Sequence, residues 1–179
     1  MLAIAWIVAC AAVGAIAQTA PPEEGRAYEV ALKMFQDGLF ELADRECAAY
    51  TAAYPNSERM ADIVVVQAQA RLKLKRFDDA LALLTDHAAA AGARADEFVF
   101  WRAETLSQKG QPGPAAYAFA QLATSFPQSP RRLNAAYREA YLRHELGETD
   151  RAVALLRDPN LPFTQAAAAQ PESEFAARG

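Results

Sequence analysis

Apolar and polar residues follow the period of an amphipathic helix along most of the chain, and the pattern breaks at regular intervals. The clearest break is residues 54–57, YPNS, which recur 72 positions later as residues 126–129, FPQS. Proline cannot continue a helix, and serine is a favoured residue at the start of the next one. Each tetrapeptide therefore predicts the end of one helix and the beginning of another.

Small residues repeat with steps of 35 to 37 positions and mark two helical segments in each unit. One alanine lies in the first segment and another follows 12 positions later in the second: Ala31, Ala68, Ala103 and Ala140, then Ala43, Ala80, Ala115 and Ala152. Between the two segments of each unit the chain is expected to turn, at Gly38, Lys75, Gly110 and Gly147. A period of this length is typical of a helical solenoid, so we expect four helix pairs within residues 24–159.

The turn and cap residues give approximate boundaries for these helices. The first helices are expected at 24–37, 57–74, 96–109 and from Ser129 to the turn at Gly147, with Pro130 in the first helical position. The second helices are expected at 39–54, 77–90, 112–126 and 149–157. The joint near residues 89–96, AAAGARAD, lacks a proline and is predicted to be the weakest. In the tail, residues 160–179, we expect a short helix at most and then disorder.

This pattern resembles the tetratricopeptide repeat, in which a small residue in the first helix, a glycine turn, an Ala-x-x-x-aromatic pair in the second helix and a closing proline recur. The resemblance covers about residues 24–159. The chain lacks the Trp and the Leu-Gly pair of that repeat, its units run one to three residues longer, and the closing proline occurs only in the first and third units. The two tetrapeptides look most like a divergent subset in bacterial envelope proteins of the outer-membrane-assembly lipoprotein and TolA-binding type. The fold implied is an all-α, right-handed α-α superhelix of about four helix pairs.

The N-terminal residues 1–17 are almost wholly apolar and carry no charged side chain, which is typical of a secretory signal. Ala15 and Ala17 offer the small residues of a cleavage site, with residues 18–23 as a lead-in. Two alternatives stay open, because no Lys or Arg precedes the apolar run: an uncleaved anchor, or a lipoprotein lipidated at Cys10. We favour cleavage after Ala17, and therefore an exported, periplasmic or envelope-associated protein that touches the membrane only if this segment is retained or lipidated.

The inventory of reactive residues is thin. Among 179 residues there are two histidines, His87 and His144, and two cysteines, with no phosphate-binding loop, nucleophile elbow or metal-ligand spacing. Cys47 is expected to be a buried lone thiol. A net charge of −4 argues against a nucleic-acid partner. We therefore predict no enzymatic activity and no cofactor.

The tetratricopeptide resemblance implies that the first helices line a concave groove. Carried onto this sequence, the groove consists of Tyr28, Leu32, Phe35, Val65, Gln69, Leu72, Phe100, Glu104, Tyr137, Tyr141 and His144. Aromatic rings beside polar side chains suit an extended or helical peptide, although each ring could equally belong to the core. Trp101 lies one residue off this line and could pack between units.

These observations favour an exported protein–protein interaction scaffold of the cell envelope. Two alternatives remain: a structural repeat array of a larger or self-associating assembly, with the C-terminal end as a homo-oligomer contact, or an accessory protein that holds a cell-wall or lipid ligand.

Overall fold

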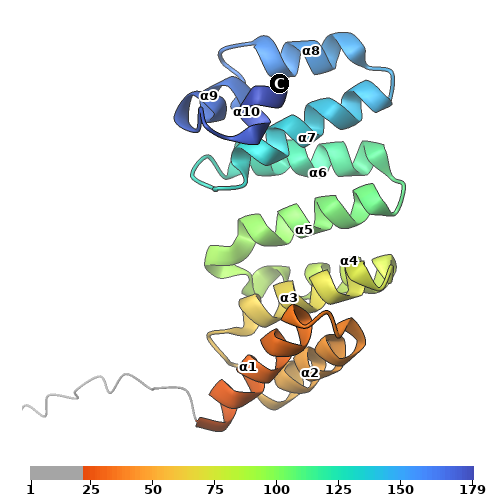
Figure 1. Ribbon diagram of the computed structural model, residues 1–179, viewed down its shortest axis with the longest axis vertical. Helices are drawn as coiled ribbons and strands as arrows, with labels where there is room; N and C mark the ends of the chain where they lie inside the picture. Colours follow the sequence, from red (N-terminus) through yellow and green to blue (C-terminus); the bar gives the residue numbers. More distant parts are fainter. Residues whose placement is uncertain (1–21) are drawn as a thin grey trace, which may run out of the picture.

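The computed structural model describes residues 22–179, and this part of the chain is helical from end to end (Figure 1). In chain order the α-helices are α1 (Pro22–Gln36), α2 (Phe40–Ala53), α3 (Met60–Lys73), α4 (Phe77–Asp86), α5 (Ala95–Gln108), α6 (Pro112–Ser125), α7 (Arg132–Glu145), α8 (Thr149–Arg157), α9 (Pro162–Ala169) and α10 (Glu174–Arg178). The predicted signal sequence 1–17 and its cleavage site lie outside the described residues. Within the described part, no helix is long and apolar enough to cross a bilayer.

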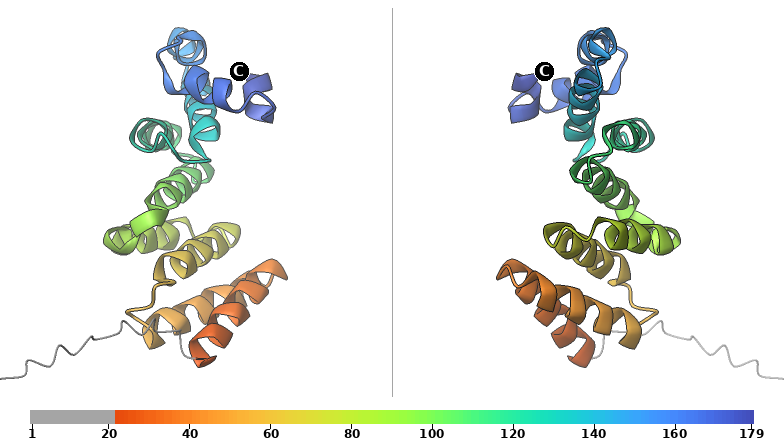
Figure 2. Two further views of the ribbon diagram at one scale, coloured as in Figure 1. Left: turned by 90° about the vertical axis from the view of Figure 1, so that its left-hand side faces the viewer. Right: turned by 90° about the vertical axis from the view of Figure 1, so that its right-hand side faces the viewer.

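The first eight helices form four antiparallel pairs stacked in chain order: α1/α2, α3/α4, α5/α6 and α7/α8. Each second helix also packs against the first helix of the next pair, so that the stack continues from α2 to α3, from α4 to α5 and from α6 to α7. In Figure 2 the first helices lie on one side of the stack and the second helices on the other. The predicted all-α repeat array of four helix pairs is confirmed.

All four turns within the pairs have the same backbone geometry. The turn residue has a positive φ of 76° at Gly38, 60° at Lys75, 81° at Gly110 and 82° at Gly147. In the first turn the N–H of Gly38 donates to the carbonyl of Phe35, and the next N–H donates to the carbonyl of Met34 at 2.9 Å. The other three turns repeat both bonds, which is the Schellman arrangement that satisfies the last carbonyls of a helix. The predicted turn positions are therefore correct, and Lys75 is the one of the four turn residues that is not a glycine.

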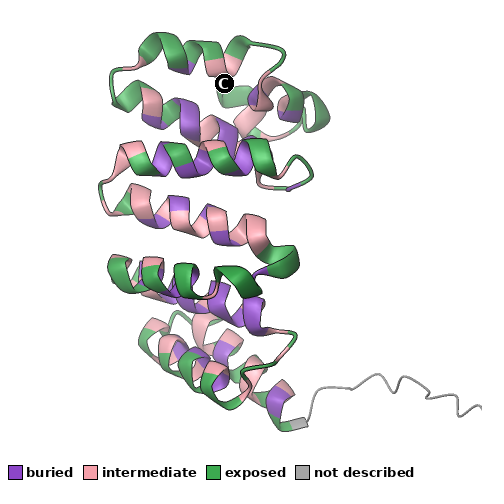
Figure 3. Ribbon diagram, turned by 180° about the vertical axis from the view of Figure 1, so that it is seen from behind, coloured by how far each residue is buried: buried purple, intermediate pink, exposed green. Residues whose placement is uncertain are grey.

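The repeating alanines lie in the buried contacts between helices. All eight are buried, and none has more than 5% of its surface exposed. Because alanine has only a methyl group, helix backbones can come close at these positions. Figure 3 shows buried residues along the central helices and mostly exposed residues on α8 at one end of the stack. Trp101 packs against the hydrophobic clusters of both the second and the third pairs, as its place beside the groove line suggested.

The serines of the repeated tetrapeptides lie before the helices that they were expected to cap. Helix α3 begins at Met60 and α7 at Arg132, each three residues after its serine. Ser57 Oγ accepts a hydrogen bond from the Arg59 N–H at 3.0 Å, and Ser129 Oγ accepts one from the Arg131 N–H at 3.1 Å. Each hydroxyl therefore stabilises a turn ahead of the helix. Pro130 accordingly precedes α7 instead of occupying its first position.

The joint between α4 and α5 differs from the other two joints between pairs. Helix α4 ends at Asp86, four residues before its predicted end, and two short 3-10 turns follow at Ala88–Ala90 and Gly92–Arg94. Alanine side chains in this stretch supply little volume for packing. At the joint predicted to be weakest, two 3-10 turns thus take the place of the last turn expected for α4.

The tail folds back on the array as two short helices. Phe163 and Ala166 on α9 are buried in the core shared by the third and fourth pairs. Helix α9 packs against α6, α7 and α8, and α10 lies against α7. The tail is therefore more ordered than the short helix and disorder expected from its alanine-rich sequence, because Phe163 and Phe175 give it apolar contacts.

Candidate protein-binding surface

The first helices α1, α3, α5 and α7 form one side of the stack, which we call the inner surface. Helix α1 at one end and α10 at the other extend toward this side, so that the inner surface is bounded at both ends (Figure 2). A segment of another protein would contact the side chains between these two walls.

The residues predicted to line a groove differ in exposure. Tyr141, with 47% of its surface exposed, and His144 are accessible, and six others are half-buried: Tyr28, Leu32, Phe35, Gln69, Glu104 and Tyr137. Phe35 packs edge-on against Phe40 of its own pair, which uses part of its ring within the array. The one exposed ring, Tyr141, and the half-buried Tyr137 therefore lie on α7, and the half-buried Tyr28 lies at the other end of the inner surface.

Three of the predicted groove residues are in the core. Val65, Leu72 and Phe100 are each 5% exposed or less. The Phe100 ring packs edge-on against Phe119 of α6, with centroids 5.9 Å apart, and against Trp101 at 5.3 Å. A ring held in this way stabilises the contact between α5 and α6 and presents almost no area to a partner. The prediction that these three line the surface is corrected accordingly.

Two arginines lie over aromatic rings at equivalent positions of the repeat. The Arg59 guanidinium is 4.8 Å from the centroid of Tyr28, and that of Arg131 is 4.6 Å from the centroid of Phe100. Both pairs have a separation of 31 residues and are offset from each other by 72. Cation–π contacts of this kind fix the arginine side chains against the first helices. The signal for them was present in the sequence, in the arginine two positions after each repeated serine.

Charged side chains on the inner surface are arranged in opposite pairs that cross from one helix pair to the next. Arg94 contacts Asp62 of α3 at 2.6 Å and Glu97 of α5 at 2.5 Å, and Glu97 also accepts from Arg131 at 3.1 Å. This chain of charges runs from the second to the fourth pair. These charges of the inner surface are therefore paired with one another across neighbouring helix pairs.

A second pair connects the middle of α5 and α7. Arg138 contacts Glu104 at 3.0 Å, and burial raises the pKa of Glu104 above its ordinary value while the arginine opposes the shift. Glu104 thus belongs to the packing between two first helices more than to an open groove. Burial also raises the pKa of Glu139, on the same helix as Arg138.

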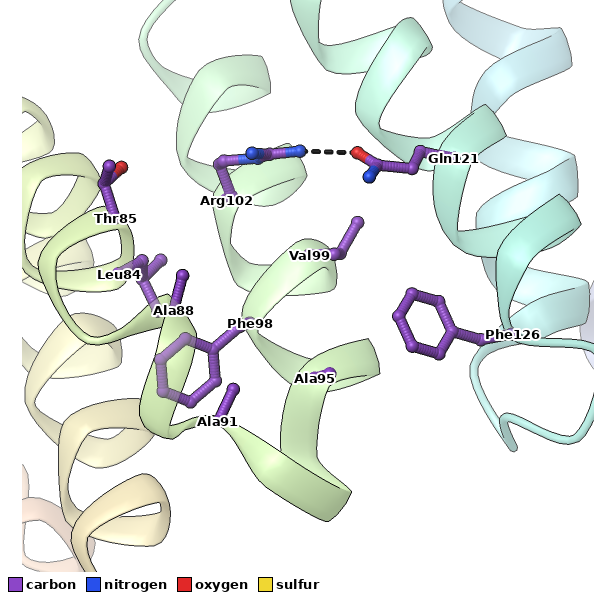
Figure 4. A pocket seen from close by; sticks show the side chains of 10 residues that line it. All are labelled: Leu84, Thr85, Ala88, Ala91, Ala95, Phe98, Val99, Arg102, Gln121 and Phe126. Atoms are coloured by element: carbon purple, nitrogen blue, oxygen red, sulfur yellow. Dashed lines mark hydrogen bonds between the residues drawn. The ribbon is translucent and has the colours of Figure 1, made fainter.

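A hollow lies between the second and third pairs, near the second helices. It has a volume of about 230 Å³, and its lining is mostly apolar (Figure 4): Leu84, Thr85, Ala88, Ala91, Ala95, Phe98, Val99, Arg102, Gln121 and Phe126. Arg102 donates a 2.7 Å hydrogen bond to Gln121 along one edge. Ligand pockets usually have roughly 300 Å³ or more, so this hollow has room for a single side chain. The hollow is present because α4 is short and the turns that follow it are rich in alanine. The sequence predicted a weak joint at this place but no hollow.

The remaining reactive residues have structural places. Cys47 is buried, and burial raises the pKa of its thiol to about 12, so the thiolate is not formed near neutral pH. Asp44 of α2 accepts hydrogen bonds from Gln67, Arg71 and Arg76, which joins the first pair to the second. Residues 22–179 contain no group of three or more His, Cys, Asp or Glu residues able to hold a metal ion.

No protein-family model, curated protein or solved structure matches this chain. The described residues form an array of helix pairs packed in chain order.

Proposed function

We propose that this protein is an exported protein–protein interaction scaffold of the cell envelope, and that it binds a segment of another protein on the inner surface of a tetratricopeptide-like array. The observation that carries the proposal is the pair of aromatic side chains on α7, the exposed Tyr141 and the half-buried Tyr137, on the side formed by the first helices. Tyrosine supplies a large contact area at low conformational entropy cost and adds a hydrogen-bonding hydroxyl.

The fold supports this role in two ways. Stacked helix pairs form an extended surface that no single pair could provide, and the ion pairs between successive helix pairs hold that surface in shape. The envelope location rests on the apolar residues 1–17 and on the two repeated tetrapeptides, as a resemblance. The tetratricopeptide assignment rests on the turn, alanine and serine positions of the repeat.

Site-specific photo-crosslinking tests the proposal. A photoreactive phenylalanine analogue at position 141 should crosslink to a protein of the envelope in living cells, because about half of Tyr141 is open to solvent on the inner surface. Tyr117 offers a matched control, since it is 69% exposed but lies on α6, a second helix. The same analogue at position 117 should give little or no crosslink to that protein.

The identity of the crosslinked protein then allows a direct measurement. Tyr141→Ala should weaken its binding by about tenfold, the effect of roughly 1.4 kcal/mol, whereas Tyr117→Ala should not. Equal crosslinking from both positions, or binding that survives Tyr141→Ala unchanged, would overturn the proposal.

A further inference from the structure

The C-terminal segment 171–179 covers part of the inner surface. The ring of Phe175 on α10 lies against Tyr137 of α7, with centroids 5.8 Å apart and planes inclined by 45°. Phe175 and Ala176 both pack against the core cluster of the third and fourth pairs. In Figure 2, α10 projects from α7 toward the side of the first helices. Of the two rings proposed to bind a partner, the half-buried Tyr137 is therefore already in contact with an aromatic side chain of the same chain.

The segment also covers the polar area next to Tyr137. Gln170, Ser173 and Phe175 form one wall of a hollow of about 440 Å³. The opposite wall is made by residues at the beginnings of α5 and α7: Asp96, Glu97, Pro130, Arg131 and Asn134. The Asn134 Oδ1 atom is buried without a hydrogen-bond partner among residues 22–179. The tail thus lies over a buried acceptor of the array, the Oδ1 atom of Asn134, and donates no hydrogen bond to it.

Few interactions hold this segment in place. The hydrogen bonds and the ion pair found for residues 171–179 are made within residues 170–179, such as the Phe175 N–H to Ser173 Oγ and Arg178 to Glu174. Helix α10 has five residues, too few to be stable alone. Its attachment to the array is therefore the apolar contact of Phe175 and its small neighbours, including Gly179 against the ring of Phe163. By contrast, α9 is anchored by buried Phe163 and by the hydrogen bond from Arg132 to Gln165.

We propose that residues 171–179 are an internal occupant of the inner surface at Tyr137, and that they compete there with a partner segment that also carries an aromatic side chain. This inference rests on the proposed function, since occupation inhibits only if the surface binds a partner. A covalently attached segment acts at an effective concentration of the order of millimolar, so even a weak contact keeps the site mostly closed. A partner must therefore displace Phe175 to reach Tyr137.

The tail peptide itself is the probe. A fluorescent peptide of residues 171–179 is titrated with the wild-type protein and with Phe175→Ala, and binding is followed by fluorescence anisotropy. Phe175→Ala should bind the peptide at least tenfold more tightly than the wild type, because its own tail no longer fills the site. Glu172→Ala, an exposed change in the same tail, is the matched control and should behave like the wild type. A peptide without the ring at the position of Phe175 should not bind either protein.

A photoreactive group placed in the peptide at the position of Phe175 maps the contact, and it should crosslink to α7. Equal binding by the wild type and Phe175→Ala, no binding to either, or a crosslink away from α7 would each overturn the inference. These results are independent of the Tyr141 crosslink in cells. If the peptide behaves as expected and Tyr141 captures no protein, the proposed function fails while the occupancy stands. If a captured protein binds the wild type and Phe175→Ala equally, the function stands and the competition is refuted.

Discussion

Ser57 and Ser129 make the same pair of hydrogen bonds at two joints of the array that lie 72 residues apart. Each serine accepts from the N–H two residues ahead and donates to a carboxylate 33 residues behind, at the start of the preceding first helix. The acceptor is Glu24 for Ser57, at 2.6 Å, and Asp96 for Ser129, at 2.5 Å. One small side chain thus shapes the turn and also fastens it to the previous helix pair.

The two joints differ in one partner, which predicts unequal effects of the same substitution. Tyr50 also donates to Glu24, at 2.7 Å, but the equivalent position in the third unit is Leu122, which has no donor. Ser129→Ala should therefore destabilise by about 1–3 kcal/mol, because it leaves a partly buried carboxylate without its hydroxyl. Ser57→Ala should have a smaller effect. Chemical denaturation of both variants measures the difference, and a larger loss from Ser57→Ala would mean that the hydrogen bond from Tyr50 does not compensate for the lost serine.

Lys75 occupies a turn position where the other three units have glycine. A left-handed conformation costs an L-residue roughly 1–2 kcal/mol, and glycine avoids this cost. Part of the gain in stability is lost again, because glycine has more conformational freedom in the unfolded chain. Lys75→Gly is expected to stabilise the protein by about 0.5–1 kcal/mol, seen as a rise of a few degrees in Tm. Gly147→Ala, with φ of 82° at the equivalent position, should do the opposite. A fall in Tm with Lys75→Gly would mean that the lysine side chain has a stabilising role.

Ala103 marks the close approach of α5 to its neighbours and has no exposed surface. Ala103→Leu should overpack this contact and destabilise the protein by about 1–3 kcal/mol. Ala48→Leu is the matched control, because Ala48 is exposed on α2 and the larger side chain can extend into solvent. Thermal denaturation compares the two variants. Equal Tm values for the two variants would mean that a small side chain is not required at Ala103, one of the repeating alanine positions.

The fold could be predicted from the sequence because its determinants are local and repeated. The φ of each turn, the buried alanines and the repeated serines all follow from residue types whose backbone and size preferences are strong. The inner surface could not be predicted as well. Phe100 and Tyr137 lie at comparable places in their helices, but the ring of Phe100 packs against Phe119 of the array and the ring of Tyr137 packs against Phe175 of the tail. Such long-range packing leaves no periodic signal in the sequence.

The tail illustrates the same limit. Its alanine-rich sequence predicts weak helices, and α10 is indeed only five residues long. Its position is set by Phe163 and Phe175, whose partners are far away in the sequence. The hollow near Phe98 and Phe126 likewise depends on the early end of α4. The absence of a closing proline from the joint that follows α4 indicated a weak joint, but it did not indicate where the helix ends.

Phe100 and Tyr141 separate stability from recognition. Phe100→Ala should destabilise the protein by about 3–5 kcal/mol, since it removes a buried ring that packs against Phe119 and Trp101. Tyr141→Ala should change stability by no more than about 0.5 kcal/mol, because much of its ring is in solvent. Unfolding free energies from denaturant titration test both values. A Phe100→Ala protein as stable as the wild type would place that ring outside the core.

The joint at Ser57 also predicts how stability depends on pH. Hydrogen bonds from Ser57, and then from Tyr50, lower the pKa of Glu24 below its ordinary value near 4.5. Because the folded state favours the carboxylate, Glu24 contributes stability above the unfolded pKa, and this contribution is lost as the pH falls through the lowered folded pKa. The opposite sign holds for Glu104 and Glu139, whose pKa values burial raises, so the pH profile of the wild type alone is a mixture.

Comparison with Glu24→Gln isolates the contribution of this carboxylate. The variant should be less stable than the wild type at pH 7, because an amide oxygen accepts weaker hydrogen bonds than a carboxylate. The gap should narrow as the pH falls below about 4.5 and through the lowered pKa of folded Glu24, since the wild-type carboxylate is then protonated. Tm measured across this range gives the difference directly, with Glu29→Gln on the exposed side of the same helix as the control. A gap that stays constant as the pH falls through the acid range would mean that the hydroxyls of Ser57 and Tyr50 do not favour the charged form of Glu24.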